Sequence, residues 1–208
     1  MARAAAIIAS AVLLAACNAL PDKPVRASLY YFGPGSVVPE APAAPTQPPI
    51  VLPDVETPSS FDGAPIMYRL GYADPHQLRP YAFARWGAPP PQLVRQKLRE
   101  QLGRERLVLD SEEAAGVARA GAARPRVLRV QLEEFTHYFE SQGQSHGLVR
   151  LRCTLLEPTP AGERPIGQRT FTLRSPAATA DASGGVKALA AATEAAAQEV
   201  ARWLQQLR

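Results

Sequence analysis

Cysteine and lysine are both scarce in this sequence. Cys17 and Cys153 are the only cysteines among 208 residues, so a single disulfide is the most that could form within the chain. Lysine occurs only at Lys23, Lys97 and Lys187, and the net charge of +4 is mild. No cluster of basic residues is interleaved with aromatic ones, which argues against a nucleic-acid-binding protein. A hydrophobic content of 46% predicts a packed core.

Common catalytic and nucleotide-binding motifs are also missing. The sequence contains no Gly-x-Ser-x-Gly, no Cys-x-x-Cys and no His-Glu-x-x-His motif. The segment GPGSV at residues 33–37 matches no phosphate-binding loop, so we predict no ATP site. We therefore expect a protein that is not an enzyme and that needs no cofactor. A hydrolase with an unrecognised site stays open as an alternative.

The few histidines allow only an incomplete metal site. His137 and His146 could face each other across a hairpin turn, and Glu140 could add a third ligand. We expect no metal and interpret these residues as exposed turn histidines, with His76 solvated in another turn. Glu133 and Glu134 are adjacent on a predicted strand, so they should point to opposite faces and cannot form a glycosidase pair by themselves.

The N-terminus has the parts of a secretory signal. Arg3 precedes an apolar stretch at residues 4–14, which is too short to span a bilayer because that takes about 20 residues. Residues 14–17, Leu-Ala-Ala-Cys, are similar to a bacterial lipobox, in which the cysteine is lipidated and becomes the first residue of the mature chain. We predict a signal peptide over residues 1–16, a lipidated Cys17 and a tether over residues 17–28. Asn18 favours export to the outer membrane.

The rest of the chain predicts a single domain over residues 29–208. Residues 33–49 hold six prolines and should form an extended insertion, unless they are a spacer and the domain starts at Ile50. Alternating and β-branched segments predict strands. They cover residues 29–32, 50–55, 64–72, 77–86, 106–110, 126–140, 148–157 and 166–173.

Three details of these strands can be predicted. Pro53 suggests that strand 50–55 lies at an edge or a bulge, and residues 73–76 should form the turn between the third and fourth strands. The apolar alternation of strand 126–140 changes phase near Glu133, which predicts a β-bulge. Cys153 shares one face of its strand with Val149 and Leu151, so we interpret it as a buried hydrophobic residue.

Two segments have the periodicity of amphipathic helices. One follows the prolines at 89–91 and places Val94, Leu98 and Leu102 on one face. The other is C-terminal, preceded by Gly184 and Gly185 as a flexible lead-in. Residues 111–124 should be a loop or a short helix. The predicted fold class is α/β (α+β): one mixed, largely antiparallel sheet of six or seven strands with the two amphipathic helices on one face.

The segment FARWG at residues 83–87 joins a strand to the first helix. Arg85 and Trp86 lie at this junction, where they could staple the helix to the sheet or form a partner-binding hot spot, since both residue types are enriched in hot spots. Together with Tyr81 they are our candidate partner-binding residues. The staple is the favoured interpretation, and the hot spot requires that Trp86 be exposed.

The combination of these features resembles the ABC-type transport auxiliary lipoprotein family, which includes the paraquat-inducible protein C type. The resemblance rests on the lipobox, the YYFGP strand, residues 66–69, residues 81–86 with their trailing prolines, the helix ending at Leu102 and the closing VARWLQQL. It covers nearly the whole mature chain, and its motifs are structural. The proline-rich insertion looks longer than the family needs.

The resemblance implies a non-enzymatic lipoprotein on the periplasmic face of the outer membrane. Such a protein would dock a periplasm-spanning mammalian-cell-entry domain protein of an intermembrane lipid transport system and, through it, an ABC permease and ATPase. A phospholipid and a second copy of the chain are open as further partners. The alternative is a structural envelope lipoprotein that supports assembly of another outer-membrane or secretion complex.

Overall fold

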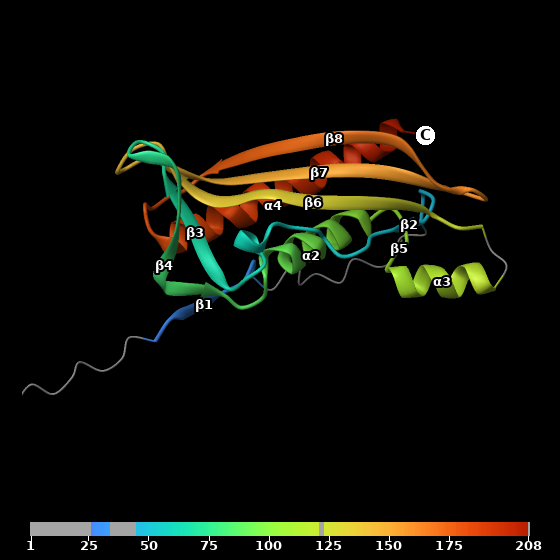
Figure 1. Cartoon of the computed structure of the whole chain (residues 1–208), viewed down its shortest axis with the longest axis horizontal. Coiled ribbons are helices and arrows are strands. Elements are labelled where there is room, and N and C mark those ends of the chain that lie inside the picture. Colours follow the sequence, from blue (N-terminus) through green and yellow to red (C-terminus); the bar gives the residue numbers. More distant parts are fainter. Residues whose placement is uncertain (1–25, 34–44, 121–122, 208) are drawn as a thin grey trace, which may run out of the picture.

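The computed structural model describes residues 26–33, 45–120 and 123–207, which form one mixed sheet with helices packed against it (Figure 1). The predicted signal peptide, Cys17 and most of the proline-rich insertion lie outside these residues. The strands are β1 Ser28–Tyr30, β2 Ile50–Val51, β3 Pro65–Leu70, β4 Asp74–Trp86, β5 Val108–Leu109, β6 Arg126–Phe139, β7 Ser145–Thr159 and β8 Gly162–Pro176. The helices are the 3-10 turn η1 Ser59–Phe61 and the α-helices α2 Pro90–Leu102, α3 Ser111–Arg119 and α4 Ala182–Gln206.

Most of the sheet is antiparallel, as predicted. β6, β7 and β8 form a meander, and β3 and β4 form a hairpin. Parallel pairs join β1 to β4, β3 to β6, and β2 to both β5 and β6. The described part of the sheet has eight strands rather than six or seven. The strands predicted at residues 50–55 and 106–110 are present but shortened to the two-residue strands β2 and β5, which long-range parallel pairing holds in the sheet.

β6 contains the predicted β-bulge. Its pairing with β7 shifts register between Leu132 and Glu134, so that the buried side chains change phase there. The bulge overturns the expectation that Glu133 and Glu134 point to opposite faces. Glu133 pairs with Arg152 at 2.6 Å and Glu134 with Arg69 at 3.4 Å, and the strand register places both arginines on the face turned away from the core. Both carboxylates therefore lie on this outer face as partners of arginines.

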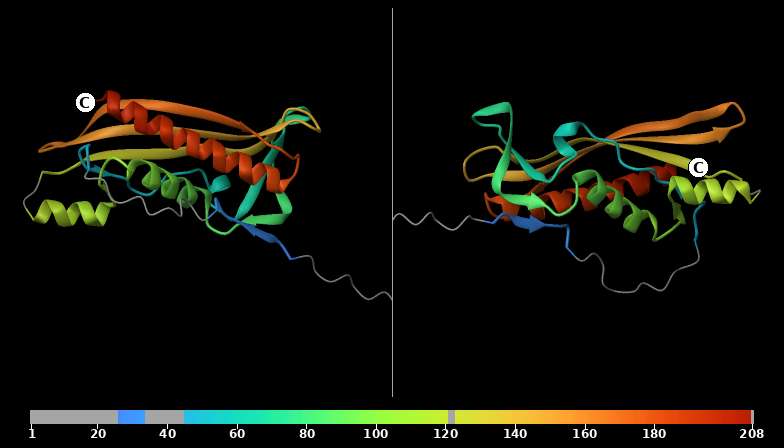
Figure 2. Two further views of the ribbon diagram at one scale, coloured as in Figure 1. Left: turned by 180° about the vertical axis from the view of Figure 1, so that it is seen from behind. Right: turned by 60° about the horizontal axis from the view of Figure 1, so that its bottom comes forward.

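α2 and α4 cover the same face of the sheet, as predicted (Figure 2). α2 starts with prolines. N–H groups in the first turn of a helix have no partner within the helix, so the N–H that proline lacks costs no hydrogen bond there. Its predicted apolar stripe, Val94, Leu98 and Leu102, is fully buried. On the sheet side, a methyl group on Gly147 would overlap the backbone of α4, so this glycine lets the helix lie directly on β7.

The start of α4 differs from the expectation of a flexible lead-in. Gly184 and Gly185 are buried within its first turn, and Asp181 caps the helix by accepting a 2.8 Å hydrogen bond from the Gly184 N–H. A methyl group on Gly185 would overlap the ring of His137 on β6. Gly185 is needed because the helix approaches the sheet closely, whereas a methyl group on Gly184 would overlap Thr179 in the segment before the helix. The contact of Gly185 is tertiary and leaves no signal in the local sequence.

Two turn and strand predictions were also wrong in detail. The β3–β4 turn lies at residues 71–73 rather than 73–76, and Gly71 leaves room there for the Tyr138 ring. β2 ends at Val51, ahead of Pro53, and it lies between β5 and β6 rather than at an edge. The proline thus ends this strand early instead of marking an edge or a bulge.

Residues 111–119 form the short helix α3, one of the two options predicted. Asp110 and Glu113 make a capping box, with both bonds at 2.8 Å. Glu113 also pairs with Arg99 of α2 at 3.3 Å. No side chain of α3 is buried, so this helix stands beside the core rather than in it (Figure 1).

Candidate functional site

The segment predicted to bind a partner is largely internal. Trp86 is only 2% exposed and packs against Phe32 and Phe135, with ring centroids 5.7 and 5.6 Å apart. The hypothesis of an exposed hot spot at Trp86 is therefore wrong, and the alternative, an indole packed inside the fold at this junction, is confirmed. Tyr81 and Arg85 are half-buried.

Tyr81 and Arg85 are held by contacts within the fold. The Tyr81 hydroxyl lies 2.8 Å from Nδ1 of His137. Burial raises the pKa of Tyr81 far above its ordinary value and lowers the pKa of His137 to about 4, although Asp181 acts against the shift at His137. The pair is therefore neutral at physiological pH. The Arg85 guanidinium donates to the Tyr81 and Ala84 carbonyl oxygens, which fixes the shape of β4.

The same stretch of β4 carries an exposed aromatic residue that the sequence did not single out. Phe83 is 59% exposed, and Leu29 and Tyr31 on the neighbouring β1 segment are 65% and 55% exposed. Leu29 lies opposite Arg85 in the parallel pair, and alternation places Phe83 on the side of Arg85. We call Leu29, Tyr31 and Phe83 the β1–β4 patch.

The patch is a sizeable part of the exposed apolar surface. Five large hydrophobic side chains are exposed in the described ranges, and the other two, Tyr72 and Leu107, lie elsewhere. Isolated exposed hydrophobic residues are ordinary, whereas a group of them marks an interaction surface. Strand propensity at residues 29–32 could locate the strand but not the face that it buries.

The two histidines do not form a metal site. In the β6–β7 pair, His137 lies opposite Gly147 and His146 lies opposite Tyr138, so the imidazoles point to opposite faces of the sheet. They are also not exposed, contrary to our interpretation: His137 is 0% and His146 is 7% exposed. Nδ1 of His146 lies 3.4 Å from Glu140, and burial lowers the pKa of His146. No group of three metal-ligating side chains occurs in the part of the chain that the structure describes.

The outer face of the sheet has a polar groove near the β3–β4 turn. The groove has a volume of about 730 Å³. Its lining includes Tyr72 from the turn, His76 from β4, His146 and Arg150 from β7, Arg174 from β8, and the carboxylates Glu134 and Glu140. Arg150 and Arg174 are exposed and pair with no carboxylate among the described residues. This corner of the sheet therefore offers two arginines to a partner.

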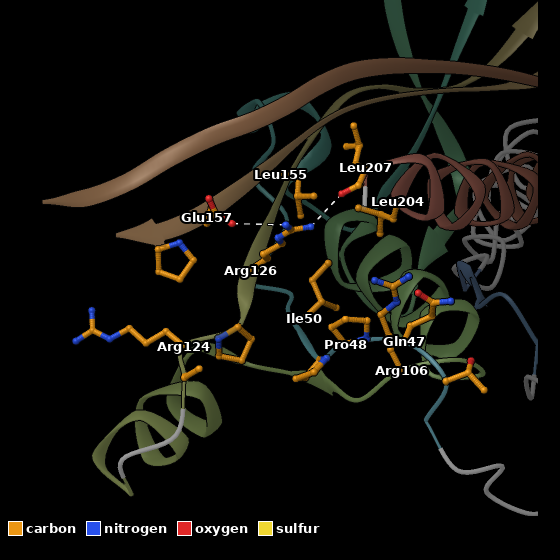
Figure 3. A pocket seen from close by; sticks show the side chains of 15 residues that line it. Gln47, Pro48, Ile50, Arg106, Arg124, Arg126, Leu155, Glu157, Leu204 and Leu207 are labelled. Atoms are coloured by element: carbon orange, nitrogen blue, oxygen red, sulfur yellow. Dashed lines mark hydrogen bonds and ion pairs between the residues drawn. The ribbon is translucent and has the colours of Figure 1, made fainter. Parts of the chain in front are cut away.

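A second cavity lies at the opposite end of the long strands (Figure 3). Its volume is about 780 Å³, and apolar side chains line much of it, among them Ile50, Leu155, Leu204 and Leu207. Arg126 bonds the Leu207 carbonyl oxygen at 3.0 Å and pairs with Glu157 at 3.5 Å, while Arg124 points away from the cavity. Arg126 thus fastens the end of α4 to the sheet.

Cys153, the cysteine within the described residues, is shielded from chemical reaction by burial. Cys153 is 0% exposed on the inner face of β7, as predicted, and burial raises its pKa to about 12. Among the helices that the structure describes, none has the length and hydrophobicity needed to cross a membrane.

Comparison with known proteins identifies the family. A family model described as the ABC-type transport auxiliary lipoprotein component matches residues 30–201, from the end of β1 into the last turns of α4. The chain belongs to this family. The match confirms the resemblance inferred from the lipobox and from the strand and helix segments. No curated protein matches the chain.

Solved structures share the fold of this auxiliary lipoprotein. The crystal structure of protein XCC0632 from Xanthomonas campestris is similar, with a TM-score of 0.64 and 19% identity over 80% of this chain and 89% of that one. The hypothetical protein CT253 from Chlamydia trachomatis has a TM-score of 0.50 and 6% identity over 77% of this chain and 97% of that one. At these identities the likeness extends to the fold alone.

Proposed function

We propose that this auxiliary lipoprotein is anchored at the periplasmic face of the outer membrane and docks a mammalian-cell-entry domain protein, which works with an ABC permease and ATPase. In this proposal residues 1–16 are removed, Cys17 carries the lipid, residues 17–28 are the tether, and residues 29–208 are the docking domain. Family membership and the lipobox support the proposal. The role is one of position and binding rather than catalysis.

The observation that carries the docking role is the outer-face groove. α2 and α4 pack on the inner face of the sheet, which leaves the outer face of β7 and β8 exposed at Arg150 and Arg174. Two arginines without carboxylate partners among the described residues favour an acidic surface on the partner. Tyr72 and His76 at the rim add polar and aromatic contacts.

The residues proposed from the sequence then act in two ways. Arg85 is half-exposed and stays a proposed partner contact at the edge of the domain. Tyr81 and Trp86 act indirectly, because their contacts with His137 and Phe135 hold β4 in the shape that presents the rest of its surface.

The test is purification of a C-terminally tagged full chain from its native membranes in mild detergent, with mass spectrometry of its N-terminus and of the proteins that co-purify. We expect an acylated Cys17 and a mammalian-cell-entry protein. The variant Arg150→Glu/Arg174→Glu should reduce recovery of the partner on the order of tenfold. The control Lys187→Glu/Arg202→Glu makes the same charge change on exposed positions of α4 and should leave recovery unchanged.

Other outcomes would redirect the proposal. An acylated chain that instead brings down components of an assembly or secretion complex would establish the structural role. If Cys17 is intact and no transport partner is present, both the anchor and the docking role are refuted. Equal losses in the groove variant and in the α4 control would show that the groove is not the docking site.

A further inference from the structure

The β1–β4 patch and the anchor are close in the chain. Eight residues lie between Cys17 and Arg26, where the described domain begins, so Arg26 is nine residues along the chain from the cysteine; β1 starts at Ser28. A fully extended chain of that length spans about 30 Å at most. The short tether therefore keeps Leu29 and Tyr31 close to the lipidated cysteine. This step rests on the anchor of the proposed function.

The chemistry of the patch suits the surface of a bilayer. Tyrosine and phenylalanine side chains partition into the interface between headgroups and acyl chains, and leucine adds apolar area. The exposed basic side chain of Arg26 flanks the patch at the start of the domain, next to β1. Anionic headgroups attract such a charge. Aliphatic and aromatic side chains with an adjoining arginine match an anionic lipid surface.

We propose that the β1–β4 patch of Leu29, Tyr31 and Phe83 rests on the membrane surface and holds the domain in one orientation. β1 lies at the side of the molecule away from the long strands β7 and β8 in both views (Figures 1 and 2). With the patch on the bilayer, the long strands are turned toward the periplasm. The lipid anchor then fixes the position of the domain, while the patch fixes its orientation.

A fluorescent probe at Phe83 tests this contact. The variant Phe83→Cys is labelled with an environment-sensitive nitrobenzoxadiazole dye in the lipidated full chain, in which a thioether to diacylglycerol blocks the Cys17 thiol and Cys153 is buried. The labelled protein is reconstituted into vesicles of phosphatidylethanolamine and phosphatidylglycerol and recovered by flotation. Leu107→Cys, at a position that is 53% exposed and outside the patch, is the matched control. Leu29→Cys repeats the measurement on the neighbouring strand.

We expect blue-shifted emission with a gain on the order of twofold at residues 83 and 29, and no change at residue 107. A protein that floats with the vesicles while the probes at 83 and 29 behave like the probe at 107 would overturn the membrane contact and leave the anchor intact. A protein that fails to float would refute the anchor and the orientation together. If the shift at residue 83 appears only after the transport partner is added, the patch belongs to that partner and the membrane contact is wrong.

Discussion

The imidazole of His137 should make the fold less stable in mild acid. Its side chain is 0% exposed, and burial lowers its pKa from 6.5 to about 4, with Asp181 opposing the shift and His146 adding to it. In the unfolded chain the imidazole regains its ordinary pKa of about 6.5. Between these values the unfolded state binds a proton that the folded state does not. Stability is therefore complete above about pH 6.5 and falls as the pH drops toward 4.

The size of the effect follows from the two pKa values. At about pH 4.5 the unfolded imidazole is almost fully protonated, whereas the folded one is only partly so. We expect His137 to lower the free energy of unfolding by roughly 2–3 kcal/mol between about pH 7.5 and 4.5. Burial also lowers the pKa of His146, which contributes in the same direction.

Urea unfolding of the full chain in detergent, followed by the fluorescence of the buried Trp86 and Trp203, measures this free energy at each pH. His137→Gln should remove the contribution of His137 while that of His146 remains. The control His76→Gln changes an exposed histidine and should keep the slope of the wild type. If the wild type and His137→Gln lose the same free energy over this range, burial of the imidazole is not the cause and the reasoning is refuted.

Three further predictions follow from packing. Gly185→Ala should lower the free energy of unfolding by about 1–3 kcal/mol because its methyl group overlaps the ring of His137. The control Gly116→Ala on α3, where the nearest atom is 3.9 Å away, should instead raise the free energy of unfolding by about 0.5–1 kcal/mol. Equal effects of the two variants in urea unfolding would contradict the explanation. Cys153 should resist a thiol reagent in the native chain and react at full rate in denaturant, so rapid native labelling would disprove its burial. Trp86→Ala should cost about 3–5 kcal/mol in chemical denaturation, and a variant of unchanged stability that loses only partner binding would restore Trp86 as a direct contact.

The sequence predicted best what local periodicity determines. The three long strands, the bulge near Glu133 and the apolar stripe of α2 all follow from the spacing of apolar residues within one segment. The errors come from contacts between distant segments. Burial of Trp86 depends on its contacts with Phe32 and Phe135, and burial of Gly185 depends on the approach of α4 to His137.

The candidate site was harder to predict for the same reason. The segment around residues 81–86 was identified by residue type, but which of its side chains are exposed depends on the face that β4 turns to the core. Phe83 is exposed because it alternates with the buried Ala84 and Trp86, and the sequence shows this only once the buried face of β4 is known. The groove at Arg150 and Arg174 joins two strands and a distant turn, and no single segment indicates it.

The central place of β6 has a consequence for export. β3 and β2 pair with its two ends, and both precede it in the chain, while β1 reaches it only through β4 and β3. In an export from the N-terminus, as the proposed function implies, β1, β3 and β4 can pair with one another and β2 with β5 as they emerge, but neither group can join the long strands until residues 126–139 have followed. The two parts of the sheet would then be united late, after more than half of the polypeptide has crossed, and their unpaired edges would be exposed to proteases and aggregation during that interval.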